Sequence, residues 1–429
     1  MLEKLFQLEA SGTTVRREVI AGLTTFLTMA YIIFVNPSIL QIAGMDFGAV
    51  FMATCLAAAF GSAFMGLYAN YPIALAPGMG LNAYFTFGVV KGMGFTWEVA
   101  LGAVFISGLI FLLISLVKIR EMIVNAIPMS MKLGIAAGIG LFLAIIALKN
   151  ANIIAAHPAT YVTMGDVKSM PVLLAAFGFA LIAALSSRRV PGAIIISILL
   201  VTIISIPLGL TEFKGIASAP PSMAPTFLKM DIKGALEVGL WAIIFVFLFV
   251  DLFDNTGTLI GVAHRGGFLD KDGKLPRIGK ALVVDSTSAS VGAMLGTSTT
   301  TSYIESTAGV DAGGRTGLTA VVVALCFVLA IFFAPLAGTV PAFATAPALL
   351  YVACLMAMSF KDLDWEDVTE FVPAVITAIT MPLTFSIAHG IGIGFICYAA
   401  IKILSGRAGE MKIAVPIIAV LFAIKLIVG

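Results

Sequence analysis

The sequence predicts an all-α polytopic membrane protein with 14 transmembrane segments, arranged as two inverted repeats of seven. Three observations predict this fold class. Of the 429 residues, 60% are apolar and 11% are charged, whereas soluble domains average about 45–50% and 25%. The apolar residues form runs close to the length of about 20 residues that a membrane-spanning helix needs. The third run in each half is interrupted by proline, glycine or hydroxyl residues.

The first half contains seven apolar runs, each bounded by charge, proline or glycine. They cover residues 17–40, 48–69, 73–90, 97–117, 126–148, 170–187 and 190–210. Residues 1–16 precede them and lack the layout of a signal peptide, so we expect a cytoplasmic N-terminus. A polar stretch, 211–234, carries several prolines and lysines and is predicted to be an extracytoplasmic linker.

The second half contains seven further runs. They cover residues 235–262, 278–295, 297–311, 315–336, 339–359, 369–385 and 387–404. Because seven is odd, two tandem copies must insert with opposite orientation, which predicts an inverted repeat over 17–210 and 235–404. Residues 405–429 hold one more apolar run, 411–428, which either crosses the membrane or lies at its interface.

The basic residues predict the orientation of the chain. The net charge of +2 comes without a clustered basic face, so nothing indicates a nucleic-acid partner. If the N-terminus is cytoplasmic and every run crosses, 17 of the 25 Lys and Arg residues lie inside and 6 outside. This bias obeys the positive-inside rule and favours a multi-pass protein of the plasma (inner) membrane. The four cysteines lack disulfide or metal-site spacing, and we expect no metal.

The two interrupted runs predict where a ligand binds. Residues 74–85 contain Pro77, Gly78 and Gly80, and residues 296–309 are almost wholly polar. Such backbone is tolerated at membrane depth only when it is buried in protein or lines a wet cavity. We expect each run to begin as a short extended stretch and to continue as a half-helix whose free N–H groups face the bilayer centre. The alternative is a pair of re-entrant turns that let helices pack closely.

Carboxylates inside the membrane are the sharpest chemical signal. Asp251 and Asp254 lie in an otherwise apolar run, where one central Asp costs roughly 2.5–3.5 kcal/mol. With Asn255 and Thr258 they follow the i, i+3, i+4, i+7 spacing of one helix face. Glu305 is a third acid, expected one turn into the second half-helix. These acids are predicted to bind a ligand or carry a proton, and the alternative is that they cap buried backbone N–H groups.

Further predicted ligand contacts come from the interrupted runs and from nearby aromatic residues. Asn82 offers a donor and an acceptor that could read the edge of a heterocycle, although capping the half-helix is an alternative role. Ser302 adds a hydroxyl group from the second interrupted run. The rings that could stack on a flat ligand are those of Phe26, Tyr31, Tyr84 and Phe253, and only some of these can face one site. The three histidines lie in loops or at run ends, where we expect ordinary loop roles.

Three blocks of sequence resemble the nucleobase-cation symporters, also called nucleobase/ascorbate transporters. They are Thr24 to Ile32, the Ala-Pro-Gly-Met-Gly-Leu-Asn-Ala block from Ala76, and the Asp-Asn-Thr-Gly-Thr-Leu block from Asp254. The resemblance extends over essentially the whole chain and is strongest to the adenine/guanine/hypoxanthine permease branch. It implies a core domain from spans 1–4 and 8–11, a gate domain from spans 5–7 and 12–14, and a homodimer formed through the gates.

The resemblance also implies a function and assigns residues to it. It implies a proton-coupled symporter that imports purine nucleobases by alternating access, with no cofactor beyond the proton gradient. Asp254, Glu305 and Asn82 match the family's substrate-binding positions. We add Phe26, Tyr84, Phe253 and Ser302 as predicted substrate contacts from their place in this sequence. Proton coupling would fall to Asp251, Asp254, Glu305 and Thr258. Thr258 stands where uracil and xanthine members carry His, which weakens a His-centred proton route here.

Three other functions are alternatives to this one, and one of them is a passive channel, which saturable uphill accumulation would exclude. An anion exchanger of the same architecture should carry a cation in its site, and none of the predicted site residues is Lys or Arg. An intramembrane aspartyl enzyme could use two acids that share a proton, but it would not need paired interrupted helices or a repeat. We therefore do not expect an enzyme. The sequence does not rank the purines, and it leaves both H⁺ and Na⁺ open as the coupling ion.

Overall fold

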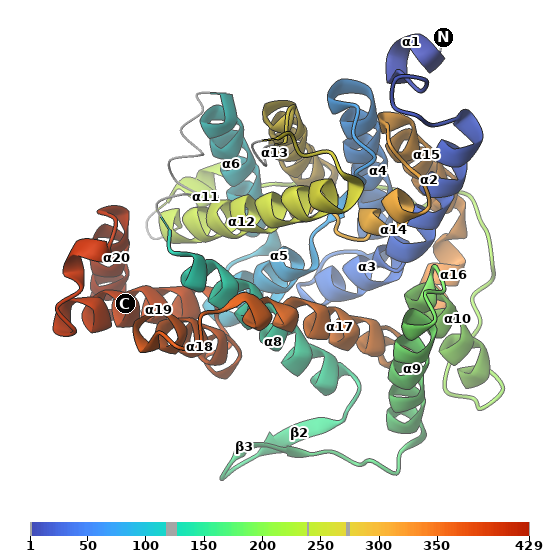
Figure 1. Ribbon diagram of the computed structural model, residues 1–429. Coiled ribbons are helices and arrows are strands. Elements are labelled where there is room, and N and C mark those ends of the chain that lie inside the picture. Colours follow the sequence, from blue (N-terminus) through green and yellow to red (C-terminus); the bar gives the residue numbers. More distant parts are fainter. Residues whose placement is uncertain (1, 117–126, 238–239, 272–274, 429) are drawn as a thin grey trace.

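The computed structural model describes residues 2–116, 127–237, 240–271 and 275–428, and its helices pack in two groups (Figure 1). The first, the core group, contains α2 (Val15–Met29), α3 (Ile32–Ile42), α4 (Phe47–Phe64), η1 (Met65–Ala69), β1 (Leu75–Pro77), α5 (Met79–Ala83), η2 (Tyr84–Gly92), α6 (Trp97–Leu116), α12 (Trp241–Gly266), α13 (Ile278–Leu295), β4 (Thr300–Ser302), α14 (Ser306–Asp311), α15 (Gly317–Ala330), η3 (Ile331–Phe333) and α16 (Ala334–Thr339). The second, the flanking group, contains α8 (Met129–Asn150), α9 (Met170–Ser187), α10 (Ala193–Ser205), α17 (Ala342–Ala357), η4 (Met358–Asp362), α18 (Val368–Leu383), α19 (Ile387–Leu404), η5 (Ala408–Glu410) and α20 (Ala414–Val428). Two short helices, α1 (Leu2–Phe6) and α11 (Ile232–Leu236), pack at the margin of the core group, against α15 and α6 respectively.

Each group combines helices from both halves of the chain. In the core group, α15 packs on α2 and α4, and α13 packs on α6 and α4. In the flanking group, α17 and α18 pack on α8, and α19 packs on α18. Blue and orange ribbons therefore lie side by side on the right of Figure 1. This is the same division into spans that the resemblance implies for core and gate.

The chain is a multi-pass membrane protein. Within the described residues, nine helical stretches are long and apolar enough to cross a membrane, and three shorter apolar helices accompany them. Several predicted runs form two shorter pieces instead of one long helix, because turns or short strands interrupt them. The count of 14 segments therefore stays a prediction, and so do the repeat boundaries.

Two short strands form an antiparallel pair within the core group. β1 pairs antiparallel with β4, with Leu75 opposite Ser302 and Pro77 opposite Thr300. The Gly78 N–H extends the ladder by donating to the Thr299 carbonyl oxygen at 2.9 Å. Both strands are buried, and each is followed by a short helix, α5 or α14. The extended stretch plus half-helix predicted for both interrupted runs is confirmed, and an antiparallel pair is the arrangement expected of an inverted repeat.

Close helix packing in the core group depends on two glycines. A Cβ built on Gly317 of α15 would lie 1.9 Å from the Gly66 carbonyl oxygen, and one built on Gly66 would lie 2.4 Å from the Gly317 oxygen. Any larger residue must push the two backbones apart. Small residues allow this kind of backbone approach between membrane helices.

Asn70 and Glu18 satisfy the backbone N–H groups at the start of α15. Asn70 adopts left-handed backbone with φ of 53°, and its Oδ1 accepts from the Gly317 N–H at 2.7 Å. The buried Glu18 carboxylate accepts from the N–H groups and hydroxyls of Thr316 and Thr319 and from the Arg315 N–H. An acid at a helix N-terminus satisfies orphan donors and opposes the helix dipole.

A β-hairpin not predicted from the sequence projects from the flanking group. β2 (Ile154–His157) pairs with β3 (Tyr161–Met164), and nearly all of its residues are exposed. Figure 1 shows the hairpin extending away from the helices after α8. The His157 Nδ1 accepts from the backbone N–H groups of Ala159 and Thr160 at 3.3 Å. The loop histidine of the sequence prediction is therefore a turn-stabilising residue.

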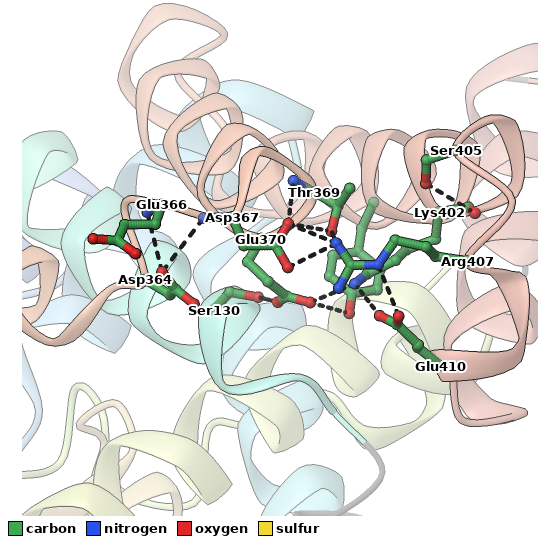
Figure 2. Close-up of polar contacts among 11 residues, drawn as sticks. Ser130, Asp364, Glu366, Asp367, Thr369, Glu370, Lys402, Ser405, Arg407 and Glu410 are labelled. Atoms are coloured by element: carbon green, nitrogen blue, oxygen red, sulfur yellow. Dashed lines mark hydrogen bonds and ion pairs between the residues drawn. The ribbon is translucent and has the colours of Figure 1, made fainter.

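A charged cluster joins α8, α18, α19 and η5 (Figure 2). Lys402 of α19 is 1% exposed, and its Nζ lies 2.8 Å from carboxylate oxygens of both Glu370 and Glu410. Glu370 also accepts from the hydroxyls of Ser130 and Tyr398. Because a buried ammonium is costly without partners, this cluster holds the helix ends in one relative position.

Arg407 extends the charged cluster beyond α19. Its guanidinium bonds Asp367 and Glu410 at 2.8 and 2.7 Å. The Arg407 contact lowers the pKa of Glu410 to about 2, and the Thr369 hydroxyl bond, with Arg407, lowers the pKa of Asp367 to about 2. Both acids therefore stay ionised at neutral pH and tie η5 to α18.

The last apolar run forms α20, which packs against α19. Val415, Ala419 and Phe422 are buried on its inner face. A Cβ on Gly392 of α19 would lie 2.7 Å from the Phe422 ring, so glycine allows this close approach. Residues such as Ile417 and Leu421 on its other face are exposed. The 15 residues of α20 extend about 22 Å, which is shorter than the hydrocarbon core.

Candidate functional site

Glu305 lies at the junction between β4 and α14. It occupies the N-cap position of α14, and not a position one turn inside, because the extended stretch reaches Ser302 and delays the start of the helix. Its Oε1 accepts a hydrogen bond from the Tyr31 hydroxyl at 2.5 Å, and Tyr31 is fully buried. The Thr28 hydroxyl reaches the Glu305 carbonyl oxygen at 3.4 Å. The Tyr31 hydroxyl therefore binds the Glu305 carboxylate. Its ring can stack on a ligand only with the hydroxyl engaged in this bond or after the bond is broken.

Asp254 of α12 lies close enough to Glu305 to interact electrostatically. Asp254 is exposed, whereas Asp251, Asn255 and Thr258 are buried. The common face stays a prediction, and Asp254 is its exposed member. At 3.6 residues per turn, Asp254 lies about 100° around the helix from Asn255, so it stands at the edge of that face. This edge position is open to solvent and lies within electrostatic range of Glu305.

Asp285 holds the second interrupted run in place, and the sequence analysis missed it. This fully buried residue of α13 accepts hydrogen bonds at Oδ1 from the Ser302 N–H at 2.9 Å and the Ser302 hydroxyl at 3.2 Å. Ser302 was predicted as a ligand contact, but its N–H and hydroxyl both bind Asp285. The signal that could have revealed Asp285 is an acid in an apolar run directly before the polar one.

Asn82 of α5 faces the second interrupted run. Its Oδ1 accepts a hydrogen bond from the Ser298 hydroxyl, and the residue is fully buried. Within the described residues, its Nδ2 has no hydrogen-bond partner. It makes no side-chain cap on α5, so the capping alternative is wrong. A buried amide with an unpaired donor is suited to bind an acceptor on a ligand.

Asn36 is a second buried amide that the sequence analysis missed. Its Nδ2 donates to the hydroxyls of Thr54 at 2.7 Å and Thr297 at 2.8 Å. It thereby links α3, α4 and the segment that leads into β4. Asn36 of α3 and Asp285 of α13 thus both position the second interrupted run.

The predicted aromatic contacts divide into three cases. The ring of Phe26 packs edge-on against Phe327 of α15 at 5.2 Å. The ring of Tyr84 packs edge-on against Phe247 at 4.9 Å, and its buried hydroxyl has no partner within the described residues. The side chain of Phe253 lies outside the part of the chain that the structure describes. Tyr84 therefore combines a fixed ring with an unpaired polar group.

The arrangement is suited to a small, mostly neutral ligand with both donors and acceptors. Asp254 and Glu305 offer carboxylate oxygens for N–H groups, while Asn82 offers an amide donor. None of the predicted site residues is cationic. Within the described residues, no group of three or more His, Cys, Asp or Glu side chains is arranged to hold a metal ion.

Residues 16–393 match the model of the Xan_ur_permease family, described as a permease family. The chain belongs to this family. The match confirms the nucleobase/ascorbate transporter family predicted from the three sequence blocks. Because members of this family are permeases, the chain is a transporter and not an enzyme.

Named relatives resemble the chain over nearly its whole length. The adenine permease AdeP of Escherichia coli (strain K12) is 51% identical over 427 residues, covering 100% of this chain and 96% of the relative. The guanine/hypoxanthine permease PbuG of Bacillus subtilis (strain 168) is 47% identical, covering 99% and 98%. A putative permease of Methanocaldococcus jannaschii is 55% identical, covering 99% and 98%.

Solved structures share the fold at low sequence identity. The transmembrane domain of the cyanobacterial bicarbonate transporter BicA superimposes with a TM-score of 0.67 at 18% identity, covering 87% of this chain and 96% of that one. Murine Slc26a9, an anion transporter in the inward-facing state, gives 0.65 at 11% identity, covering 91% and 68%. These likenesses support the inverted-repeat architecture and are informative about the fold alone.

Proposed function

We propose that the chain is a proton-coupled symporter that imports purine nucleobases such as adenine, guanine or hypoxanthine. The observation that carries the proposal is the electrostatic interaction of Asp254 with Glu305, together with the unpaired buried donor of Asn82 on the other interrupted run. Purines present ring N–H groups to acceptors and ring nitrogens to donors, which matches this set of side chains. The names of the relatives, which include adenine and guanine/hypoxanthine permeases, support the same class of substrate.

The chemistry of the site suggests how coupling works. A purine bound between β1–α5 and β4–α14 would donate N–H bonds to Asp254 and Glu305 and accept one from Asn82. A proton on one of the two acids relieves the repulsion between adjacent carboxylates, so protonation and binding favour each other. Asp251 and Thr258 lie buried one turn away on α12, where they would adjust the position of Asp254 and its proton.

We propose that alternating access uses the two helix groups. Movement of the core group against the flanking group would expose the site to one side and then the other. Exposed residues follow α12 from Asp254 through Gly257 and Ile260 to His264. At the opposite end, Phe385 packs against Phe87 and Phe142 across the two groups. With a cytoplasmic N-terminus, the exposed residues of α12 would line a path from the site to the cytoplasm.

The setting proposed for the protein is the plasma (inner) membrane, as a homodimer that meets through the flanking groups. The test is uptake of radiolabelled hypoxanthine, guanine and adenine into proteoliposomes with and without an inward proton gradient. Gradient-driven accumulation, blocked by purines but not by uracil or sulfate, supports the proposal. Uptake driven by a Na⁺ gradient and not by a proton gradient would show that Na⁺ is the coupling ion. If folded protein takes up no purine, the proposed substrate class is overturned.

A further inference from the structure

A cavity lies between the two helix groups. Neither Asp254 nor Glu305 is among its described lining residues. Its volume is about 340 Å³, within the range of about 300–1,000 Å³ that is usual for small-molecule sites. It lies where α3, α8 and α16 end and α17 begins. With a cytoplasmic N-terminus, all of these ends face the exterior.

The polar lining of the cavity combines one ammonium donor, two side-chain amides and two hydroxyl groups. Lys214, from the segment between α10 and α11, is the one charged side chain among the described lining residues. The amides of Gln41 and Asn150 also line it, and no hydrogen bond to another described side chain occupies them. The hydroxyl protons of Ser38 and Thr345 already bond the carbonyl oxygens of Phe34 and Ala342, at 2.7 and 3.0 Å.

Lys214 is held against the wall of the cavity. Its backbone N–H donates to the Thr339 hydroxyl at 3.1 Å. Its Cδ and Nζ lie 3.5 and 4.0 Å from the position of a Cβ on Gly338. The aliphatic part therefore runs along α16, and the ammonium lies at the lining. A lysine ammonium is a donor and never an acceptor.

The rest of the lining is apolar and comes from both groups. Val35 and Ile39 of the core group and Leu349 of the flanking group are among these residues. An apolar slot with donors at its rim suits a flat heterocycle that carries acceptors. A 6-oxopurine presents adjacent O6 and N7 acceptors, whereas adenine presents an N6 amino donor beside N7.

We propose that this cavity is an outer subsite that a purine occupies before it reaches Asp254 and Glu305, and that Lys214 biases it toward 6-oxopurines. The inference rests on the proposed function, since it takes its substrate class from it. It assigns a specificity role to a linker residue that the central site does not use. Lys214 acts here by binding the purine oxygen, and the central acids serve both classes of purine.

The test compares concentration dependences of uptake for hypoxanthine and adenine in proteoliposomes. Lys214→Met removes the charge, and Lys229→Met makes the same change elsewhere on the exposed linker as a control. We expect Lys214→Met to raise the KM for hypoxanthine roughly threefold to tenfold, as for loss of one hydrogen bond, and to leave the adenine KM within about twofold. Lys229→Met should leave both unchanged.

A second variant narrows the cavity and leaves Lys214 in the sequence. A side chain at Gly338 meets only Lys214 at ordinary contact distance, so Gly338→Leu should fold and should weaken uptake of external purines. Gly279→Leu, at a helical position with open space, is the control. The subsite is refuted if Lys214→Met changes the KM for hypoxanthine and the KM for adenine equally, or changes neither. It is also refuted if Gly338→Leu takes up external purines as well as Gly279→Leu does. If the wild type takes up no purine, the proposed function fails instead.

Discussion

Removing the Asp285 carboxylate tests how the second interrupted run is held. Asp285→Ala leaves the Ser302 N–H and hydroxyl, 2.9 and 3.2 Å from Oδ1 in the wild type, without their acceptor. A hydrogen bond to a charged group contributes about 1.5–3 kcal/mol, and an orphaned buried donor costs about the same. A loss of about 3 kcal/mol would let β4 detach from α13. Because Glu305 follows β4 by three residues, its carboxylate would lose its fixed position beside Asp254.

The expected result is a loss of purine uptake by about 100-fold in Asp285→Ala, which corresponds to about 3 kcal/mol. Asp285→Asn keeps one acceptor oxygen and should lose only about 1 kcal/mol, or fivefold. The assay is initial uptake in proteoliposomes, normalised to folded protein by size-exclusion chromatography. Ser288→Ala on the same helix is the control, because the Ser288 hydroxyl bonds a carbonyl oxygen of its own helix, that of Val284, at 2.7 Å. Wild-type uptake in Asp285→Ala would refute the reasoning.

Three further predictions concern coupling, packing and pH. Glu305→Gln should abolish accumulation driven by a proton gradient; accumulation equal to wild type would remove Glu305 from the coupling mechanism. Gly317→Ala should lower the melting temperature of the purified protein, because its Cβ would lie 1.9 Å from a carbonyl oxygen, whereas Gly279→Ala should not; equal melting temperatures would contradict this. Since the pKa of Glu410 falls from 4.5 to about 2 in the folded protein, the stability gained from its Arg407 partner is present above pH 4.5 and lost as pH falls toward 2. Arg407→Gln should therefore have a lower melting temperature than wild type at pH 7, and the difference between the two melting temperatures should shrink below pH 4.5. A difference that grows as the pH falls would contradict this prediction.

Much of the fold could be predicted because lipid restricts the backbone to a few solutions. A run such as 278–295 forms a helix with the predicted bounds, since every N–H and C=O must be paired within the segment. The polar run after it could be identified for the same reason. Interrupted backbone must find partners elsewhere in the protein, and β1 and β4 find them in each other.

Other features depended on contacts that spacing does not encode. Asp285 lies among hydroxyl residues on α13, and only the fold brings it to the Ser302 N–H. Asp254 matched the spacing of a helix face, yet its position at the edge of that face decides its exposure. The β2–β3 hairpin has exposed residues on both faces, so the alternating pattern that identifies a half-buried strand is absent.

The pairing of β1 with β4 also bears on how the protein is made. The Tyr303 hydroxyl donates to the Pro77 carbonyl oxygen at 2.6 Å across 226 residues of chain. At about 5–20 residues per second, the ribosome makes that interval in roughly 11–45 s. During this time the backbone of β1 has entered the membrane and its partner strand has not been synthesised. The insertion machinery must therefore shelter an unpaired strand, and a nascent chain stopped before residue 300 should be a preferred substrate for membrane quality-control proteases.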